Sequence, residues 1–439
     1  MKPWLQILVA LLLAIFVGYL VGTFGRTADG ELGAGAAGFA AFSDYIGKLF
    51  LQALKMVIVP LIFSSIVVGI AGLGKIEGFG RLGAKTIGYY TLTSFFAILI
   101  GLSMVNLFKP GMKDGEPNEK IAQIVLADEE AFAKKAGDKA AGQDVEGMSA
   151  VADIFKRMIP ENVFEVFSDN GRMLALIFVS LLVAFGLIYI GREARDSLLG
   201  FFRGLNELMI LITNWIMVFA PIGVFGLVAA TVTKLSGGNL KELFIPLGTY
   251  FFVVLGALLL HLCVALPLIL KFVGGVSPRR QFWAMRNALL TAFSTASSSA
   301  TLPLTLRAVR ENAGTSQRVG SFVLPLGATV NMDGTALYEC VAVIFVAQLL
   351  GIDMSFTAQF MVVALALLTS IGVAGIPSAS LVAILVIINN VGIEGGEAFI
   401  GLLLAVDRPL DMTRTAVNVF SDSCGAVVIA KSEGEDLKV

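Results

Sequence analysis

Long apolar segments recur along this chain, and they limit its fold more than any other feature. Hydrophobic residues make up 56% of its 439 residues, and mean hydropathy is +0.84. Crossing a bilayer takes about 20 consecutive apolar residues. Six segments of that kind, each with at most one charge, cover residues 4–23, 50–74, 86–108, 173–191, 208–233 and 243–270. The sequence therefore predicts an all-α polytopic membrane protein. The first segment is too long for a signal peptide, so we expect it to be retained.

Basic residues between these segments predict the topology. The loops after the second, fourth and sixth segments carry clusters of lysine and arginine. The positive-inside rule places such loops in the cytoplasm. The polar stretch 111–170 is then an extracellular loop, and both termini are cytoplasmic. We expect the protein in the plasma (inner) membrane.

Charge balance and the scarcity of metal-binding residues exclude several functions. The formal net charge of -1 gives no basic surface for nucleic acid. The three cysteines form no CxxC pair or disulfide framework. A single histidine, His261, rules out an HExxH zinc motif. Neither a P-loop nor a nucleophile–base pair occurs, so we expect no enzyme and no cofactor.

After residue 286 the simple pattern of spans ends. Residues 287–306 are uncharged but hold eight serines or threonines, with basic residues at both ends. Because basic flanks place both ends of this segment in the cytoplasm, it must enter and leave the membrane on the same side. This predicts a re-entrant hairpin at about 280–310, with Ser297–Ser299 at its tip. A second uncharged stretch is interrupted by GVAGIPSAS and predicts a second hairpin at about 354–393, entering from outside.

Polar residues interrupt the predicted helix between the two hairpins, and other polar residues line one face of the last helix. Asn331, Asp333, Gly334 and Thr335 predict an unwound turn with free carbonyl oxygens, which suit a small cation. In 405–430 the polar residues recur every three or four positions, so they share one helix face: Asp407, Asp411, Arg414, Thr415, Asn418 and Asp422. A structural ion-pair ladder is the alternative, but charges at membrane depth favour a functional site. Two hairpin–helix units from opposite sides form an inverted repeat, typical of secondary transporters.

Four motifs carry a resemblance to a known family. They are SSSATLP at 297–303, NMDGT at 331–335, AGIPSAS at 374–380 and DMTRTAVNVFSD at 411–422. They resemble the signatures of the glutamate/aspartate transporter family, the dicarboxylate/amino acid:cation symporters, in a prokaryotic-type member. The resemblance implies eight transmembrane helices, two re-entrant hairpins in inverted repeats, and a homotrimer in the lipid bilayer.

The resemblance also divides the chain into two kinds of domain. Scaffold helices 1 and 2 fall in 1–85, and scaffold helices 4 and 5 in 171–235. The transport domain takes helix 3 in 86–110, and in 236–439 it takes helix 6, both hairpins, helix 7 and helix 8. This domain would move across the membrane like an elevator.

An acidic amino acid is the substrate that the resemblance implies. Arg414 would pair with its side-chain carboxylate, because a guanidinium can donate two parallel hydrogen bonds. Asp411 would hold its ammonium group. The other implied substrate contacts are Ser298, Ser299, Thr335, Gly375, Thr415 and Asn418.

Sodium ions are the implied coupling ions. A first set of ligands is Gly327, Asn331, Asn418 and Asp422; a second is Tyr90, Thr93, Ser94, Asn331 and Asp333; a third is Thr329 with the carbonyls of Ser370, Ile371 and Val373. Glu339 has apolar neighbours that favour a neutral carboxyl, and its counterpart in animal members resembles a proton carrier. A purely structural hydrogen bond is the alternative role for Glu339.

The predicted function is sodium-coupled uptake of aspartate or glutamate by an elevator mechanism, with proton co-transport as a further hypothesis. Three alternatives stay open. A proton-coupled C4-dicarboxylate symporter of the same fold would not need Asp411. A neutral amino acid symporter would not need Arg414. An anion-conducting channel would need an open polar path.

Overall fold

The computed structural model describes residues 3–27, 29, 31–71, 79–113, 116–117, 159–168, 173–235, 240–372 and 379–439. These residues are almost entirely helical or in connecting turns. The exception is a short antiparallel pair of strands, β1 (Met112–Lys113) and β2 (Glu116–Pro117). Most of the predicted extracellular loop 111–170 lies outside the described residues.

The order of the helices follows the sequence pattern closely. The first half contains α1 (Pro3–Phe24), α2 (Ala34–Ala71), α3 (Phe79–Phe108), α7 (Val163–Ser168), α8 (Met173–Tyr189), α9 (Arg192–Val218) and α10 (Ala220–Leu235). The second half contains α11 (Leu240–Leu260), the π-helix η2 (His261–Ala265), α12 (Leu266–Phe272), α13 (Pro278–Thr295), α14 (Ser298–Ala308), the π-helix η3 (Val309–Ala313), α15 (Gln317–Val330), α16 (Asp333–Leu349), α17 (Phe356–Gly372), α18 (Ala379–Val391), the 3-10 helix η4 (Gly396–Phe399) and α19 (Ile400–Ser432).

Several of these helices could cross a membrane. Three described segments are long and apolar enough: Arg81–Phe108, Phe244–Phe272 and Gln317–Leu349. The pair α9 and α10 forms a fourth candidate, bent by 53°. Shorter apolar helices cover Val9–Phe24, Val59–Ala71, Ala175–Tyr189 and Phe356–Ser370. The total of eight spans stays a prediction.

The structure corrects the expected fifth segment. It is not one helix over 208–233, because α9 ends at Val218 and α10 begins at Ala220. Pro221, the second residue of α10, explains the break: its ring clashes with the carbonyl four residues earlier and it donates no hydrogen bond. The second helix also begins earlier than expected. Alanine-rich sequence and the Asp44–Lys48 ion pair at 2.8 Å favour helix from Ala34 onward.

The predicted break in the helix between the hairpins is present but narrower than expected. Asn331 and Met332 alone leave the helical conformation, and α16 begins at Asp333. Gly334 and Thr335 are therefore helical, not unwound. The backbone N–H of Gly334 points to α19 and donates to Asn418 Oδ1 at 2.8 Å. A side chain of α19 thus satisfies one of the donors that a helix start leaves free.

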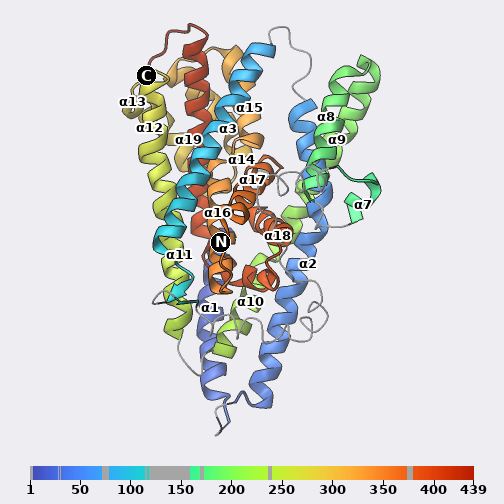
Figure 1. The fold of residues 1–439 in the computed structure, drawn as a ribbon, viewed down its shortest axis with the longest axis vertical. Helices are drawn as coiled ribbons and strands as arrows, with labels where there is room; N and C mark the ends of the chain where they lie inside the picture. The colour runs from blue at the N-terminus through green and yellow to red at the C-terminus, as the bar shows by residue number, and fades with distance from the viewer. Residues whose placement is uncertain are drawn as a thin grey trace.

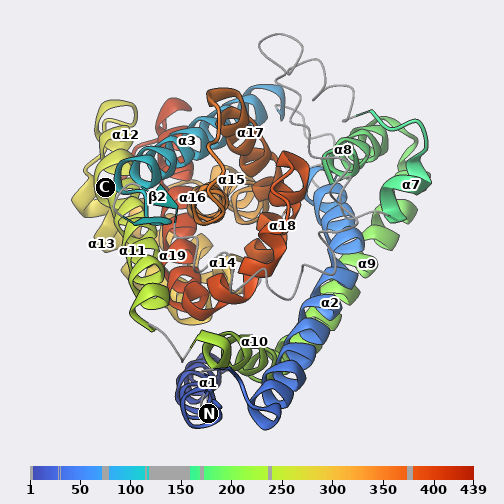
Figure 2. The same ribbon diagram turned by 60° about the horizontal axis from the view of Figure 1, so that its bottom comes forward.

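Ribbon views divide the helices into an outer arc and a central body. Figure 2 shows α1, α10, α2, α9 and α8 along one side, and α3 with α11 to α19 gathered together. Within the arc, α1 packs on α10, α10 on α2, and α2 on α8 and α9. In the body, every residue of α16 is buried, and this helix contacts α3, α17, α18 and α19 (Figure 1). Residues on α16 and α19 therefore lie deep in the molecule.

Helix pairs occur at both expected hairpins. The helices α13 and α14 pack on each other and on α19, and they are joined by Ala296 and Ser297. Ala296 adopts the left-handed conformation, with φ of 50°, and Ser297 Oγ caps α14 by accepting from Ala300 N. The second pair, α17 and α18, also packs together, but its tip at 373–378 lies outside the described residues.

Candidate functional site

The polar face of α19 is buried and held by ion pairs. Arg414 Nη1 lies 3.1 Å from Asp407 Oδ1, and Arg414 Nη2 lies 2.8 Å from Asp411 Oδ1. Arg408 Nη1 approaches Asp411 Oδ2 at 3.4 Å. Arg414 is only 2% exposed, and the two aspartates 1% and 3%. We call these four residues the arginine cluster; its positive and negative charges balance.

An aromatic ring from α16 fixes the position of the guanidinium. Arg414 Cζ lies 4.4 Å from the centre of the Tyr338 ring, a cation–π contact in a buried place. The Tyr250 ring lies next to Tyr338 and stacks on Phe345 at 4.5 Å between centres. Sequence reasoning missed Tyr338 and gave Asp407 no binding role. The seven-residue spacing of Asp407 and Arg414, two helical turns on one face, was the available signal.

A second group of polar side chains surrounds Asp333, at the start of α16. Its Oδ1 accepts from Ser94 at 2.7 Å and from Thr93 at 3.3 Å, both on α3. Its Oδ2 accepts from Ser421 on α19 at 2.6 Å and lies 3.0 Å from His261 Nε2 in η2. Four separate elements thus meet at one carboxylate. The contacts of His261 and Ser421 were not anticipated from the sequence.

Asn331 links Asp333 to a second buried carboxylate. Its Nδ2 donates to Ser421 Oγ at 3.0 Å and to Asp422 Oδ1 at 2.9 Å. Gly327 lies against the same group, since a Cβ there would be 2.5 Å from both Asp422 Oδ1 and Tyr90 Oη. Only glycine fits that approach. Tyr90 Oη itself donates to the Val323 carbonyl at 2.8 Å.

We call this second group the aspartate cluster, and its charges do not balance. It consists of Thr93, Ser94, His261, Asn331, Asp333, Ser421 and Asp422. Within the described residues, no lysine or arginine pairs with Asp333 or Asp422. Its oxygen atoms are the hard ligands that a small cation prefers. The arrangement can accommodate a positive ion.

Asn418 lies between the two clusters. Its Oδ1 accepts from the Gly334 backbone, and its Nδ2 donates to Thr335 Oγ1 at 3.2 Å. Thr415 Oγ1 donates to the Asp411 carbonyl at 2.8 Å within α19. Most of the predicted substrate and sodium residues therefore share the interfaces between α3, α15, α16 and α19.

Other predicted residues are less closely joined to this group. Ser298 is buried and Ser299 exposed at the start of α14, and no described hydrogen bond connects either with the polar residues of α19. Thr329 Oγ1 donates to the Leu326 carbonyl at 3.0 Å and Ser370 Oγ to the Leu367 carbonyl at 3.0 Å, each within its own helix. Ile371, another predicted sodium ligand, follows Ser370 on α17. Gly375 and Val373 lie outside the described residues.

Glu339 has a partner that the sequence did not reveal. It is fully buried on α16, and its Oε2 accepts from Thr369 Oγ1 on α17 at 2.7 Å. Its Oε1 has no hydrogen-bond partner in the described part of the chain. An ionised carboxylate is costly in such a place, so the geometry favours a neutral carboxyl.

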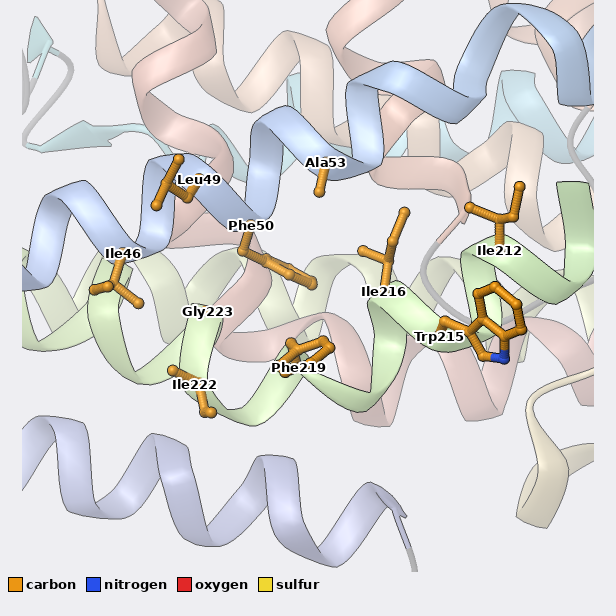
Figure 3. Close-up of a pocket in the computed structure, with 10 residues that line it drawn as sticks. All are labelled: Ile46, Leu49, Phe50, Ala53, Ile212, Trp215, Ile216, Phe219, Ile222 and Gly223. Carbon is orange, nitrogen blue, oxygen red and sulfur yellow. The ribbon is translucent and has the colours of Figure 1, made fainter.

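A large cavity elsewhere is chemically unsuited to a charged substrate. It measures about 480 Å³ and lies between α2 and the bend of α9 and α10 (Figure 3). Its lining is Ile46, Leu49, Phe50, Ala53, Ile212, Trp215, Ile216, Phe219, Ile222 and Gly223. None of these side chains carries a charge, and only the Trp215 indole nitrogen is polar. The two buried clusters remain the candidate site.

Comparison with known proteins gives one consistent result over nearly the whole chain. The model of the sodium:dicarboxylate symporter family matches residues 4–432. A proton/sodium-glutamate symport protein from Bacillus caldotenax is 36% identical over 426 residues, which cover 96% of this chain and 94% of that protein. A proton/glutamate-aspartate symporter from Escherichia coli (strain K12) is 34% identical over 388 residues, 88% of this chain and 84% of that protein. Excitatory amino acid transporter 3 from Mus musculus is 32% identical over 441 residues, which cover 89% of this chain and 79% of that protein.

Proposed function

Because this chain belongs to the sodium:dicarboxylate symporter family, we propose that it takes up glutamate or aspartate together with sodium. The observation that carries the proposal is the pairing of two buried clusters across Asn418. One contains a guanidinium that can bind a carboxylate, and the other contains two carboxylates without a lysine or arginine partner. Relatives that are named as glutamate symporters support the same substrate class.

Substrate binding would exchange one partner of Arg414 for another. Both of its terminal nitrogens are occupied by Asp407 and Asp411. An incoming side-chain carboxylate can take the place of Asp411, which is then free to accept the substrate ammonium group. Asp407 would keep the guanidinium oriented. Thr335, Asn418, Thr415, Ser298, Ser299 and Gly375 are the further contacts in this proposal.

Sodium would supply the positive charge that the aspartate cluster lacks. In the proposal, Asp422 serves one ion with Gly327, Asn331 and Asn418. Asp333 serves another with Asn331 and with three α3 residues, Tyr90, Thr93 and Ser94, whose hydroxyls would turn to offer oxygen lone pairs. Thr329 with the carbonyls of Ser370, Ile371 and Val373 forms a third set. Because Asn418 belongs to the first sodium set and also bonds to Thr335, a proposed substrate contact, cation and substrate binding would depend on each other.

A proton is a further cargo in this proposal. Glu339 is a member of neither cluster, and it bonds to Thr369 of the second hairpin. A neutral carboxyl can give up its proton when that hairpin helix moves and water reaches it. The names of two bacterial relatives include a proton, which supports the idea for this chain.

The division into arc and body supports an elevator-type mechanism. We assign the scaffold to 1–85 and 171–235, which contain the arc helices, and the transport domain to 86–110 and 236–439. Exposed apolar side chains on the arc, such as Met56, Phe201 and Val218 at 66%, 63% and 71%, suit contact with lipid or other subunits of a homotrimer. Eight spans, two re-entrant hairpins and cytoplasmic termini complete the proposal. We propose no catalytic reaction and no cofactor.

Uptake into proteoliposomes tests the proposed function. The purified protein is reconstituted, and uptake of radiolabelled aspartate, glutamate, succinate and serine is measured with and without an inward sodium gradient. We expect sodium-dependent accumulation of aspartate or glutamate. Equal accumulation of succinate would favour a C4-dicarboxylate symporter, and accumulation of serine a neutral amino acid symporter. Anion current without accumulation would favour a channel.

A further inference from the structure

A groove of about 550 Å³ lies where the start of α13, the end of η3 and the C-terminal residues meet. Figure 1 shows the C-terminus beside α12 and α13. We call this groove the cationic groove, and it is lined by Ser277, Arg279, Arg280, Trp283, Ala284, Asn312, Lys438 and Val439. The three cationic side chains are exposed, unlike those of the buried clusters. A pocket with this lining is suited to an anion.

The arginines of the groove lack the acidic partners that neighbouring arginines have. Arg307 and Arg310 pair with Glu311 at 2.9 and 3.5 Å. Among the described residues, no carboxylate pairs with Arg279 or Arg280. Their charge therefore remains available for a ligand. The positive end of the α13 macrodipole adds to it.

An exposed aromatic side chain lines the same groove. Trp283 is 56% exposed, and its ring centre lies 6.5 Å from that of Phe282 on the same helix. Arg286 Cζ lies 5.9 Å from the centre of the Trp283 ring. Aromatic rings beside cations are typical of the membrane–water interface, where headgroups and the first acyl carbons meet. A soluble anion would need the cations but not the exposed Trp283 ring.

We propose that the cationic groove binds the headgroup of an anionic phospholipid. The phosphate contacts Arg279 and Arg280, and an acyl chain lies along Trp283. Basic pockets next to membrane helices on the cytoplasmic side attract such headgroups. The inference rests on the proposed cytoplasmic position of this end of α13, and it requires nothing of the substrate or the coupling ions.

Fluorescence of Trp283 offers a local test. The chain has three tryptophans, so Trp4→Phe and Trp215→Phe leave Trp283 as the only reporter. The protein is reconstituted in phosphatidylcholine vesicles that contain brominated phosphatidylglycerol or brominated phosphatidylcholine, whose bromine atoms quench a tryptophan on contact. We expect half-maximal quenching at a much lower mole fraction of the anionic lipid.

Matched arginine variants decide whether the groove causes this preference. Arg279→Ala with Arg280→Ala should raise the required fraction of phosphatidylglycerol about thirtyfold, about 2 kcal/mol at about 1 kcal/mol per arginine. Arg307→Ala with Arg310→Ala removes an equal amount of positive charge beside Glu311, and it should change the required fraction of phosphatidylglycerol less than twofold. Equal quenching by both lipids, or equal shifts in both variants, overturns the proposal.

Two further arms complete the test. Soluble glycerol phosphate at millimolar concentration should leave the lipid preference intact; if it abolishes the preference, the groove takes a soluble anion and the lipid assignment is wrong. If the tryptophan replacements prevent folding, native mass spectrometry of the chain with its tryptophans intact counts retained phosphatidylglycerol, with the same expectations for both arginine variants. Neither measurement uses transport, so a result that overturns the lipid proposal leaves the proposed function untouched.

Discussion

The arginine cluster and the aspartate cluster are both buried, yet they satisfy their charges in different ways. In the first, Arg408 and Arg414 face Asp407 and Asp411, so each charge has a partner within the protein. In the second, Asp333 and Asp422 receive hydrogen bonds from hydroxyls and an amide, and Asp333 lies 3.0 Å from His261 Nε2, but no lysine or arginine of the described chain pairs with them. The difference indicates two tasks. A balanced cluster can exchange one carboxylate for another, whereas an acidic one can admit a cation.

Breaking the arginine cluster should have the largest effect. Arg414→Cys leaves Asp407 and Asp411 without their main partner, and removing one member of a buried pair costs roughly 3–5 kcal/mol. We expect binding of aspartate and glutamate to weaken by more than a hundredfold in calorimetry, with serine binding gained. Arg408→Gln is the matched control, because its single contact at 3.4 Å is longer and its effect should be much smaller. Unchanged aspartate affinity in Arg414→Cys would exclude its substrate role.

Neutralising the aspartate cluster should be the next largest effect. Asp333→Asn and Asp422→Asn keep the shape and remove the charge that would attract a cation. We expect each to raise the sodium concentration for half-maximal substrate binding by about tenfold or more, because one charge contact to an ion is worth at least about 1.4 kcal/mol. Asp196→Asn, an exposed aspartate paired with Arg195, should leave the sodium dependence unchanged. If Asp196→Asn and Asp333→Asn change the sodium dependence equally, the aspartate cluster is not the cation site.

Glu339 belongs to neither cluster, so its replacement sharpens the comparison. Glu339→Gln keeps the acceptor for Thr369 and removes the proton that the carboxyl can exchange. We expect sodium-dependent binding to change less than about twofold, while uptake becomes insensitive to pH. Intraliposomal pH, followed during uptake at clamped voltage, checks the prediction. If the wild type acidifies no more than the variant, Glu339 is structural.

A partly exposed group of charges gives the smallest expected effect. Hydrogen bonds from Lys85 and Arg81 lower the pKa of Glu433 at the end of α19, with Glu433 Oε1 2.6 and 3.0 Å from the two side chains. A lowered pKa in the folded state stabilises it above the unfolded pKa of about 4.3, and this contribution disappears as pH falls through the folded value. Glu433→Gln should lower the thermal midpoint slightly at pH 7 and not at all near pH 3. A midpoint loss as large as that of Arg414→Cys would contradict the distinction between buried and exposed pairs.

Sequence reasoning identified the polar helices better than it identified their partners. The positions of the apolar helices, both helix pairs and the break near Asn331 follow from local pattern, because hydrophobic periodicity and turn residues act over short distances. The bend at Pro221 was readable from the same rules and was overlooked. By contrast, His261 beside Asp333, Thr369 beside Glu339 and the Tyr338 ring beneath Arg414 join distant segments. Only the packing of α3, η2, α16, α17 and α19 brings those side chains together.

Calorimetry of aspartate and glutamate binding at a series of sodium concentrations tests the central claim most directly. In the proposed function the aspartate cluster takes up a cation, and Asn418 bonds both to Thr335, a proposed substrate contact, and to the backbone N–H of Gly334, next to Asp333. Affinity for the acidic amino acid should therefore rise steeply with sodium and be lost when choline replaces it, and substrate should raise sodium affinity by the same factor. Substrate affinity that stays constant from choline to high sodium would contradict the account.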